Sequence, residues 1–273
     1  SDSLTLANGT NTLTTVNIET LTGGTGADTI TLGGAVTNAS LDLAAGNDIV
    51  TLANATNALS ASNVETLTGG TGADTMTLGS ALTTSVTVDL AAGSDQLTLA
   101  NAANTGSVAN VETLVGGSGA DTITLGAGVT NASIDLGAGT DQLTLANGTN
   151  SATVSNTETL IGTTGPNTIT LGTGVTNASV DLGSGSDKLT LANAANTLSL
   201  SNVETTVGGT GADTVTLATA LTTSLSIDLG AGADTLRLAD VANTGSVTNA
   251  ETVVGGTGAD TITLGTAVTA ASV

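Results

Sequence analysis

A repeat of 46 or 47 residues dominates this chain and limits what it can fold into. An Asn-x-Glu motif marks each copy, and its glutamate recurs at Glu19, Glu65, Glu112, Glu158, Glu204 and Glu251. A fixed period of about 20 to 50 residues is typical of solenoids, propellers and arrays, in which each unit packs on its neighbours. We therefore expect one continuous repeat array over residues 1–273, taken from a longer protein.

The acidic residues follow this repeat. After Glu19 come Asp28, Asp42 and Asp48, and each later copy shows closely similar spacing. Of the 23 acidic residues only Asp240 lies off the pattern. Charge placed this regularly indicates an architectural role, because acids that only solubilise a surface have no reason to recur in register.

The composition excludes several classes of function. The 273 residues carry a net charge of −21, with 2 Lys plus Arg, no Cys or His and no aromatic residue. Disulfides, thiolate metal sites and catalysis by His or Cys are therefore excluded. Lys188 and Arg237 are too few to bind nucleic acid or an anionic membrane. A mean hydropathy of +0.32 argues against disorder.

The residue pattern predicts an all-β fold. Gly26-Ala27-Asp28-Thr29-Ile30 parallels Gly46-Asn47-Asp48-Ile49-Val50, 20 residues later. We therefore expect a parallel β-solenoid, similar to a β-roll or β-helix, with about two coils per repeat, one short and one long. Each coil should contain a strand after the Asp, such as 29–32, and shorter strands near 35–37 or 58–60 and near 41–43 or 64–65.

Asparagine also recurs in columns, and stacked Asn side chains can hydrogen-bond along a solenoid axis and satisfy turn backbone groups. The alternative, glycosylation at Asn-x-Ser/Thr, fits only some members, including Asn8, Asn54 and Asn147. The columns are Asn8, Asn54, Asn101, Asn147 and Asn193; Asn11, Asn57, Asn104, Asn150, Asn196 and Asn243; and Asn17, Asn63, Asn110, Asn156, Asn202 and Asn249.

The loop after each Glu has the form Gly-Gly-x-Gly-x-Asp-x-apolar-x at 23–31, 69–77, 116–124, 208–216 and 255–263. This motif resembles the repeat-in-toxin (RTX, hemolysin-type) calcium-binding nonapeptide. Weaker forms occur at 44–48, 91–95, 137–141, 183–187 and 230–234. The resemblance implies Ca²⁺ as the cofactor and implies a ligand set: Asp28, Asp48, Asp74, Asp95, Asp121, Asp141, Asp187, Asp213, Asp234, Asp260, Gly24, Gly26, Gly70, Gly72, Gly117, Gly119, Gly209, Gly211, Gly256 and Gly258.

The physical case for a metal is independent of the resemblance. Stacked loops bring carboxylates within roughly 5–10 Å of one another, and each like-charged pair costs on the order of 2–4 kcal/mol. A hard divalent cation removes this repulsion, and every available ligand is an oxygen, which favours Ca²⁺. The alternative is a tight Gly-rich turn with a solvated acid, but such a turn does not need Asp in nearly every copy.

Departures from the motif give two further expectations. Asn38 or Asn57 occupies the Asp position of the second nonapeptide, so we expect ions on one edge of the solenoid and Asn ladders on the other. In the fourth copy, 162–167, Asn167 replaces the Asp, so we expect the loop to keep its shape while its ion is weak or absent. Outer-shell charge is expected from Glu19, Asp42, Glu65, Asp89 and Glu112.

Three classes of function remain open to comparison. The first is a structural calcium-stabilised segment of a secreted bacterial surface layer, filament or adhesin stalk. Its partners are copies of itself or further repeats of the same chain, with no nucleic acid and no membrane insertion. The resemblance implies type I secretion.

The second class is ice binding by Thr-x-Thr columns. These columns are expected to be interrupted in every other coil, by Ile49, Gln96, Gln142, Lys188 and Thr235. The third, a polysaccharide lyase or hydrolase, we reject because the acids form no single site.

Overall fold

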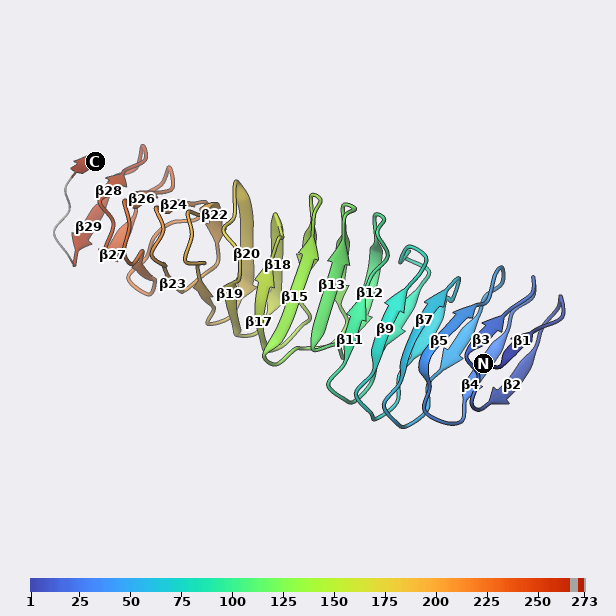
Figure 1. The fold of residues 1–273 in the computed structure, drawn as a ribbon. Coiled ribbons are helices and arrows are strands. Elements are labelled where there is room, and N and C mark those ends of the chain that lie inside the picture. Colours follow the sequence, from blue (N-terminus) through green and yellow to red (C-terminus); the bar gives the residue numbers. More distant parts are fainter. Residues whose placement is uncertain (266–269, 273) are drawn as a thin grey trace. The chain divides into compact units, whose positions relative to one another are not determined.

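The computed structural model describes residues 1–265 and 270–272, and every strand pair in it is parallel. It contains two compact units, Ser1–Thr140 and Asp141–Val273. Within each unit the strands stack coil upon coil (Figure 1). The predicted all-β parallel solenoid is confirmed. The described residues include no helix able to cross a membrane.

Each coil contributes one strand to each of two sheets. In the first unit, sheet A contains β1 (Ser3–Thr5), β3 (Thr20–Thr22), β5 (Thr37–Asp42), β7 (Ala58–Ser62), β9 (Thr75–Leu78), β11 (Gln96–Thr98), β13 (Thr113–Gly117) and β15 (Ala132–Gly137). Sheet B contains β2 (Thr12–Thr15), β4 (Thr29–Leu32), β6 (Ile49–Thr51), β8 (Thr66–Thr68), β10 (Thr87–Asp89), β12 (Thr105–Ala109) and β14 (Thr122–Leu125).

The second unit has the same construction. Its sheet A contains β17 (Asn150–Ser155), β19 (Asn167–Leu171), β21 (Lys188–Thr190), β23 (Thr205–Val207), β25 (Ser226–Asp228), β27 (Thr244–Thr248) and β29 (Thr261–Leu264). Its sheet B contains β16 (Gln142–Thr144), β18 (Thr159–Thr164), β20 (Ala178–Ser184), β22 (Thr197–Ser201), β24 (Thr214–Leu217), β26 (Thr235–Arg237), β28 (Thr252–Val254) and β30 (Ala270–Ser272).

A narrow aliphatic core lies between the two sheets of each unit. Because side chains alternate along a strand, the central residue of a three-residue strand points inward and its neighbours point outward. Leu67 in β8 and Leu97 in β11 are buried in the first unit, as are Leu189 and Leu236 in the second. Core residues stack on core residues of the next coil, for example Met76 on Leu97. Small aliphatic side chains therefore fill a space too thin for aromatic rings.

The coil count differs in detail from the prediction of about two coils per repeat. Five strands, β8–β12, lie between Glu65 and Glu112, so one repeat makes two and a half coils. Paired residues in adjacent coils are 17 to 21 positions apart, as in Gln96 with Thr113 and Thr75 with Gln96. Each coil has two strands, where three were expected. Asn63 explains part of the difference, because its positive φ of 54° makes the predicted strand at 64–65 a corner before β8.

Because each repeat makes two and a half coils, equivalent loops of successive repeats lie on alternating edges of the solenoid. We call the edge where the chain passes from sheet A to sheet B the AB edge, and the other the BA edge. The loop 23–28 joins β3 to β4 at the AB edge, whereas 69–74 joins β8 to β9 at the BA edge. The prediction of ions on one edge and Asn ladders on the other is therefore wrong, because both edges receive Asn and Asp in turn.

Candidate metal centre

The corner residues form ladders of four side chains, Asn–Asp–Asp–Glu, from four successive coils on one edge. The next coil on that edge carries a loop without an acid, such as 79–86, and ends the ladder. The ladders complete within one unit are Asn11–Asp28–Asp48–Glu65 and Asn57–Asp74–Asp95–Glu112 in the first unit, and Asn196–Asp213–Asp234–Glu251 in the second. A fourth, Asn150–Asn167–Asp187–Glu204 in the second unit, has Asn in place of the first Asp.

Each ladder is held by hydrogen bonds that run in one direction along the axis. The Asn57 N–H donates to Asp74 Oδ1 at 3.0 Å, and the Asp74 N–H donates to Asp95 Oδ1 at 2.7 Å. The Asp95 N–H then donates to Glu112 Oε2 at 2.8 Å. One carboxylate oxygen per acid is thus used to satisfy a corner N–H of the preceding coil. The Glu that marks each repeat is the terminal acceptor of its ladder.

The Asn at the start of each ladder has a structural role. Asn57 Nδ2 donates to the carbonyls of Ala53 and Ala55, at 3.0 and 2.7 Å, and to Asp74 Oδ1 at 2.8 Å. The side chain is buried, and its amide is satisfied by the protein itself. Asn104 and Asn196 repeat the arrangement.

The Asp residues in the middle of the ladders are buried carboxylates with an unused oxygen. Asp48, Asp95, Asp213 and Asp234 are each at most 1% exposed, and none of their Oδ2 atoms has a hydrogen-bond partner in the protein. Burial raises the pKa of all four carboxyl groups. The negative charges of Asp74 and Glu112 add to this effect at Asp95. A buried oxygen without a partner costs about 1–3 kcal/mol, so these atoms require a positive group that the chain does not supply.

Glycine lines a small cradle beside these oxygens, which any larger side chain would fill. A Cβ on Gly46 would collide with the Gly26 carbonyl oxygen and lie 2.6 and 2.9 Å from the two Asp48 carboxylate oxygens. Gly93 has the same surroundings, the Gly72 carbonyl and Asp95. The described residues contain no group of three or more acidic side chains able to hold a metal alone, so backbone carbonyls must complete the ligand set.

The predicted ligands divide by position. The Asp residues of the nonapeptides lie in the ladders, and the carbonyls of Gly26, Gly72 and Gly211 face the cradles. The carbonyls of the glycines two residues earlier instead accept hydrogen bonds from the next coil, as Gly24 does from the Ala45 N–H at 3.2 Å. The ligand assignments remain predictions. Gly46 and Gly93, which line the cradles, were not among the predicted residues.

The acids expected to provide outer-shell charge separate into two groups. Glu19, Glu65 and Glu112 are ladder acceptors. Asp42 and Asp89 lie elsewhere, each capping the N–H two residues later and accepting a hydrogen bond from an Asn of the next coil. Asn63 Nδ2, for example, donates to Asp42 Oδ1 at 2.7 Å. The expectation of one parallel column of charge is therefore wrong, since the corner turns place Glu and Asp in different networks.

Comparison with known families agrees with this geometry. A family model described as the RTX calcium-binding nonapeptide repeat matches four copies, at residues 13–35, 62–80, 109–129 and 247–266. The chain carries RTX-type repeats. Its cofactor is accordingly Ca²⁺, an ion that takes oxygen ligands in flexible geometry. In these repeats the middle Asp pair of a ladder and the adjacent Gly carbonyl would hold the ion, which would neutralise the carboxylates and link successive coils.

Two other comparisons add little. No curated protein matches the chain. A solved structure titled a hyperactive, Ca²⁺-dependent, β-helical antifreeze protein from an Antarctic bacterium matches at 18% identity, covering 93% of this chain and 80% of that one, with a TM-score of 0.29. Because the identity and the TM-score are both low, this similarity gives no information about the function of these RTX repeats.

Proposed function

We propose that this chain is a structural, calcium-stabilised β-solenoid segment of a secreted bacterial cell-surface or extracellular protein, such as a surface layer, filament or adhesin stalk. The observation that carries the proposal is the recurrence of buried acidic ladders at fixed spacing on both edges. Such an array would place ions between coils in successive repeats along the chain, and it concentrates no chemistry at one place.

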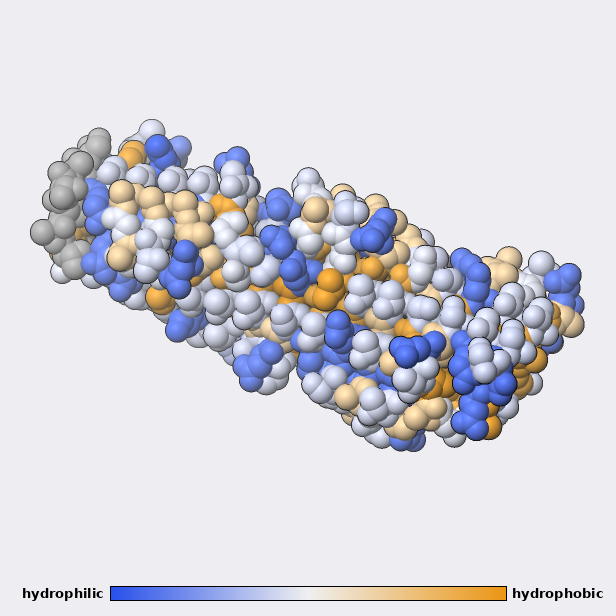
Figure 2. Space-filling view, viewed as in Figure 1, coloured by the Kyte–Doolittle hydropathy of each residue, from blue (hydrophilic) through white to orange (hydrophobic). Residues whose placement is uncertain are grey.

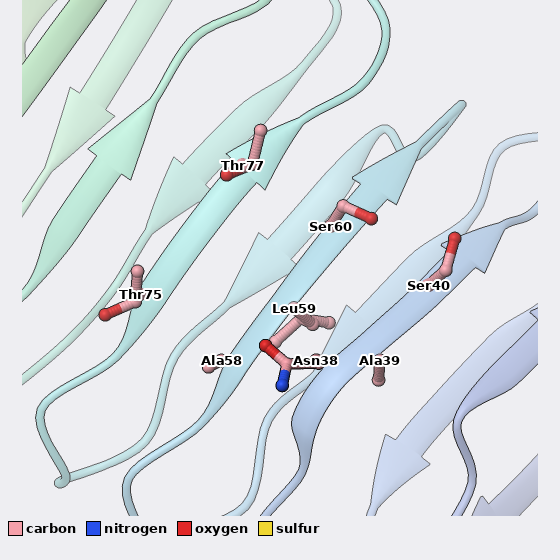
Figure 3. A pocket seen from close by; sticks show the side chains of 8 residues that line it. All are labelled: Asn38, Ala39, Ser40, Ala58, Leu59, Ser60, Thr75 and Thr77. Atoms are coloured by element: carbon pink, nitrogen blue, oxygen red, sulfur yellow. The ribbon is translucent and has the colours of Figure 1, made fainter. Parts of the chain in front are cut away.

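The surface supports a structural role over an enzymatic one. On the face seen in Figure 2, hydrophilic residues recur in small separate groups. A shallow groove of about 340 Å³ crosses β5, β7 and β9, and its lining side chains include Ser40, Ser60 and Thr77 (Figure 3). None of the residues lining this groove is titratable. We propose that the segment is not an enzyme and that it contacts further repeats or copies of itself.

Folding that depends on calcium is compatible with secretion of the chain in an unfolded state. With a net charge of −21, the chain repels itself when no cation is bound. We propose that it stays unfolded at the low calcium level of a bacterial cytoplasm, leaves by type I secretion and folds outside, where metal binding supplies folding free energy.

Calcium titration tests this proposal. Far-ultraviolet circular dichroism of the chain at pH 7 should show a β-sheet spectrum in millimolar calcium and its loss in excess chelator. Magnesium at the same concentration serves as the control for ionic strength. An unchanged spectrum and thermal midpoint in chelator would reject a calcium-stabilised structural role.

Ice binding is a second candidate, favoured by one observation in the first unit. The outer face of sheet B carries two columns in register from β2 through β8, one made of Thr throughout and one in which Ile49 replaces a Thr. The columns are Thr12, Thr29, Ile49 and Thr66, and Thr14, Thr31, Thr51 and Thr68. The expected interruption in every other coil is wrong, because Ile49 and Gln96 lie in different sheets.

The two candidates predict different results in an ice recrystallisation assay. The structural proposal predicts no inhibition by the calcium-loaded chain. Ice binding predicts inhibition that Thr31→Lys abolishes and that Thr77→Lys, on the outer face of sheet A, leaves intact. Equal loss in both variants would count against a Thr face as the binding surface.

A further inference from the structure

The fourth repeat contains an Asn where the others have the first ladder Asp, and its contacts are unlike theirs. Asn167 Nδ2 donates to the Gly165 carbonyl at 3.0 Å and to the Leu182 carbonyl at 3.1 Å. Its Oδ1 accepts from Asn150 Nδ2 at 2.8 Å, and its backbone N–H donates to Asp187 Oδ1 at 2.7 Å. The side chain is completely buried, and the oxygen and the NH₂ group of its amide both have hydrogen-bond partners.

The next repeat carries an acid in this place, on a loop whose backbone differs at one glycine: Gly165 has a φ of 101°, and its counterpart Gly211 does not have a positive φ. Asp213 corresponds to Asn167, Gly211 to Gly165 and Leu229 to Leu182. The Gly211 carbonyl faces Gly232, and the Leu229 carbonyl faces Gly208, as the equivalent carbonyls do in the fourth repeat. Asp213 Oδ1 accepts from Asn196, which leaves Oδ2 buried and without a partner.

The two repeats therefore differ in the charge of one group at the same position: an NH₂ hydrogen-bond donor in Asn167 and a negative carboxylate oxygen in Asp213. In the fifth repeat the corresponding groups are all oxygens, from Asp213 and from the carbonyls of Gly211 and Leu229, and a cation would offset their mutual repulsion. In the fourth repeat an N–H₂ group stands in the place of one of these oxygens and donates to the other two. We infer that the Asn167 amide replaces the cation at the first acidic position of the fourth ladder, so that this position is satisfied without calcium. Asp187 Oδ2, at the second position, stays buried and without a hydrogen-bond partner. This inference rests on the proposed calcium-stabilised role of the other ladders.

Two neighbouring substitutions fit a loop that holds its shape without an ion. Thr163 occupies the second Gly position of the motif, and its hydroxyl donates to the Ala146 carbonyl at 2.8 Å. Pro166 fixes the backbone φ angle immediately before Asn167. The strand that follows, β19, pairs in register with β21 as its counterparts in the other repeats do. The fourth repeat thus has a loop that its own amide, hydroxyl and proline hold in place at the first acidic position of the ladder.

A reciprocal pair of variants in the full chain tests the inference. Asn167→Asp should bind one more Ca²⁺ per chain than the unmodified protein, and Asp213→Asn should bind one fewer, as counted by equilibrium dialysis and metal analysis. At a limiting calcium concentration that just keeps the unmodified chain folded, Asp213→Asn should raise the thermal midpoint and Asn167→Asp should lower it. Asn147→Asp, at an exposed position in the same unit, controls for added charge and should leave the ion count unchanged.

The outcomes separate this inference from the proposed function. If the unmodified chain binds no calcium, the proposed function fails. If it binds calcium but Asn167→Asp gains no ion, the replacement of a cation by the amide is wrong. A lower midpoint for Asp213→Asn at limiting calcium would also overturn it, because an amide at this position is expected to stabilise the ladder when its ion is missing.

Discussion

Ala44 and Ala91 have backbone angles that glycine adopts elsewhere in the same array. Their φ values are 66° and 67°, in the left-handed region, while the equivalent Gly137 and Gly183 have φ values of 87° and 80°. A Cβ in this region costs about 1–2 kcal/mol, partly offset by the extra freedom that glycine gives the unfolded chain. Ala44→Gly should therefore raise the free energy of unfolding by about 0.5–1 kcal/mol.

Thermal unfolding in saturating calcium checks this prediction. Ala45→Gly is the matched control, because Ala45 does not have a positive φ and should lose stability when replaced by glycine. An Ala44→Gly variant no more stable than the parent would show that the loop does not impose this conformation in solution.

Gly93 tests the cradle at the level of a single atom. Gly93→Ala places a methyl group against the Gly72 carbonyl and about 2.5–2.8 Å from the Asp95 carboxylate oxygens, where the ion is expected to bind. The variant should bind fewer calcium ions. Gly34→Ala is the control, since its Cβ would approach only a Val16 methyl at 3.8 Å. Equal calcium binding by Gly93→Ala and the parent would place the ion elsewhere.

At the scale of the elements, the sequence was sufficient for the fold class and for the loops that carry the acids. Period-2 alternation after each Asp identified β4 and β6, and the Asp spacing brought the right residues to the corners. The division of a repeat into coils was less predictable, because a strand after Asp and a strand after Glu differ little in sequence. The left-handed Asn63 and Asn110, which turn the chain before Glu65 and Glu112, decide the count and thereby the edge on which each ladder lies.

The Asn at the start of a ladder should be more important to stability than its exposed neighbours. Asn196→Ala removes three hydrogen bonds, to the carbonyls of Ala192 and Ala194 and to Asp213 Oδ1, and leaves the Ala192 carbonyl and Asp213 Oδ1 buried without them. We expect a loss of about 3 kcal/mol, measured by thermal or urea unfolding in calcium. Asn193→Ala, at an exposed position in the same loop, should change stability by less than about 0.5 kcal/mol. A loss of stability in Asn196→Ala as small as that in Asn193→Ala would mean that the ladder Asn is dispensable.

The whole molecule should show an unusual pH dependence when calcium is removed. Burial raises the pKa of Asp48, Asp95, Asp187, Asp213 and Asp234 above the ordinary value of 3.8. Between that value and the raised pKa the folded state binds more protons than the unfolded state, so the free energy of unfolding falls as pH rises. In calcium-free buffer the β-sheet signal should therefore be stronger near pH 4.5 than at pH 7.

Calcium should abolish or reverse this dependence, because an ion takes over the role of the protons. Circular dichroism across this pH range, with and without calcium, measures both effects. A calcium-free chain that gains stability between pH 4.5 and pH 7 would show that its buried carboxyl groups are not the groups that oppose folding.

Crystallography with calcium tests the central claim, that ions link the coils at the ladders, most directly. Anomalous difference density from crystals grown in calcium should show peaks between the Gly26 carbonyl and Asp48, and between the Gly72 carbonyl and Asp95. These peaks would lie on opposite edges of the first unit, and none should lie beside Asn167. Fully occupied peaks at Asn167, or an ordered solenoid with no peak at Asp48 and Asp95, would contradict the account.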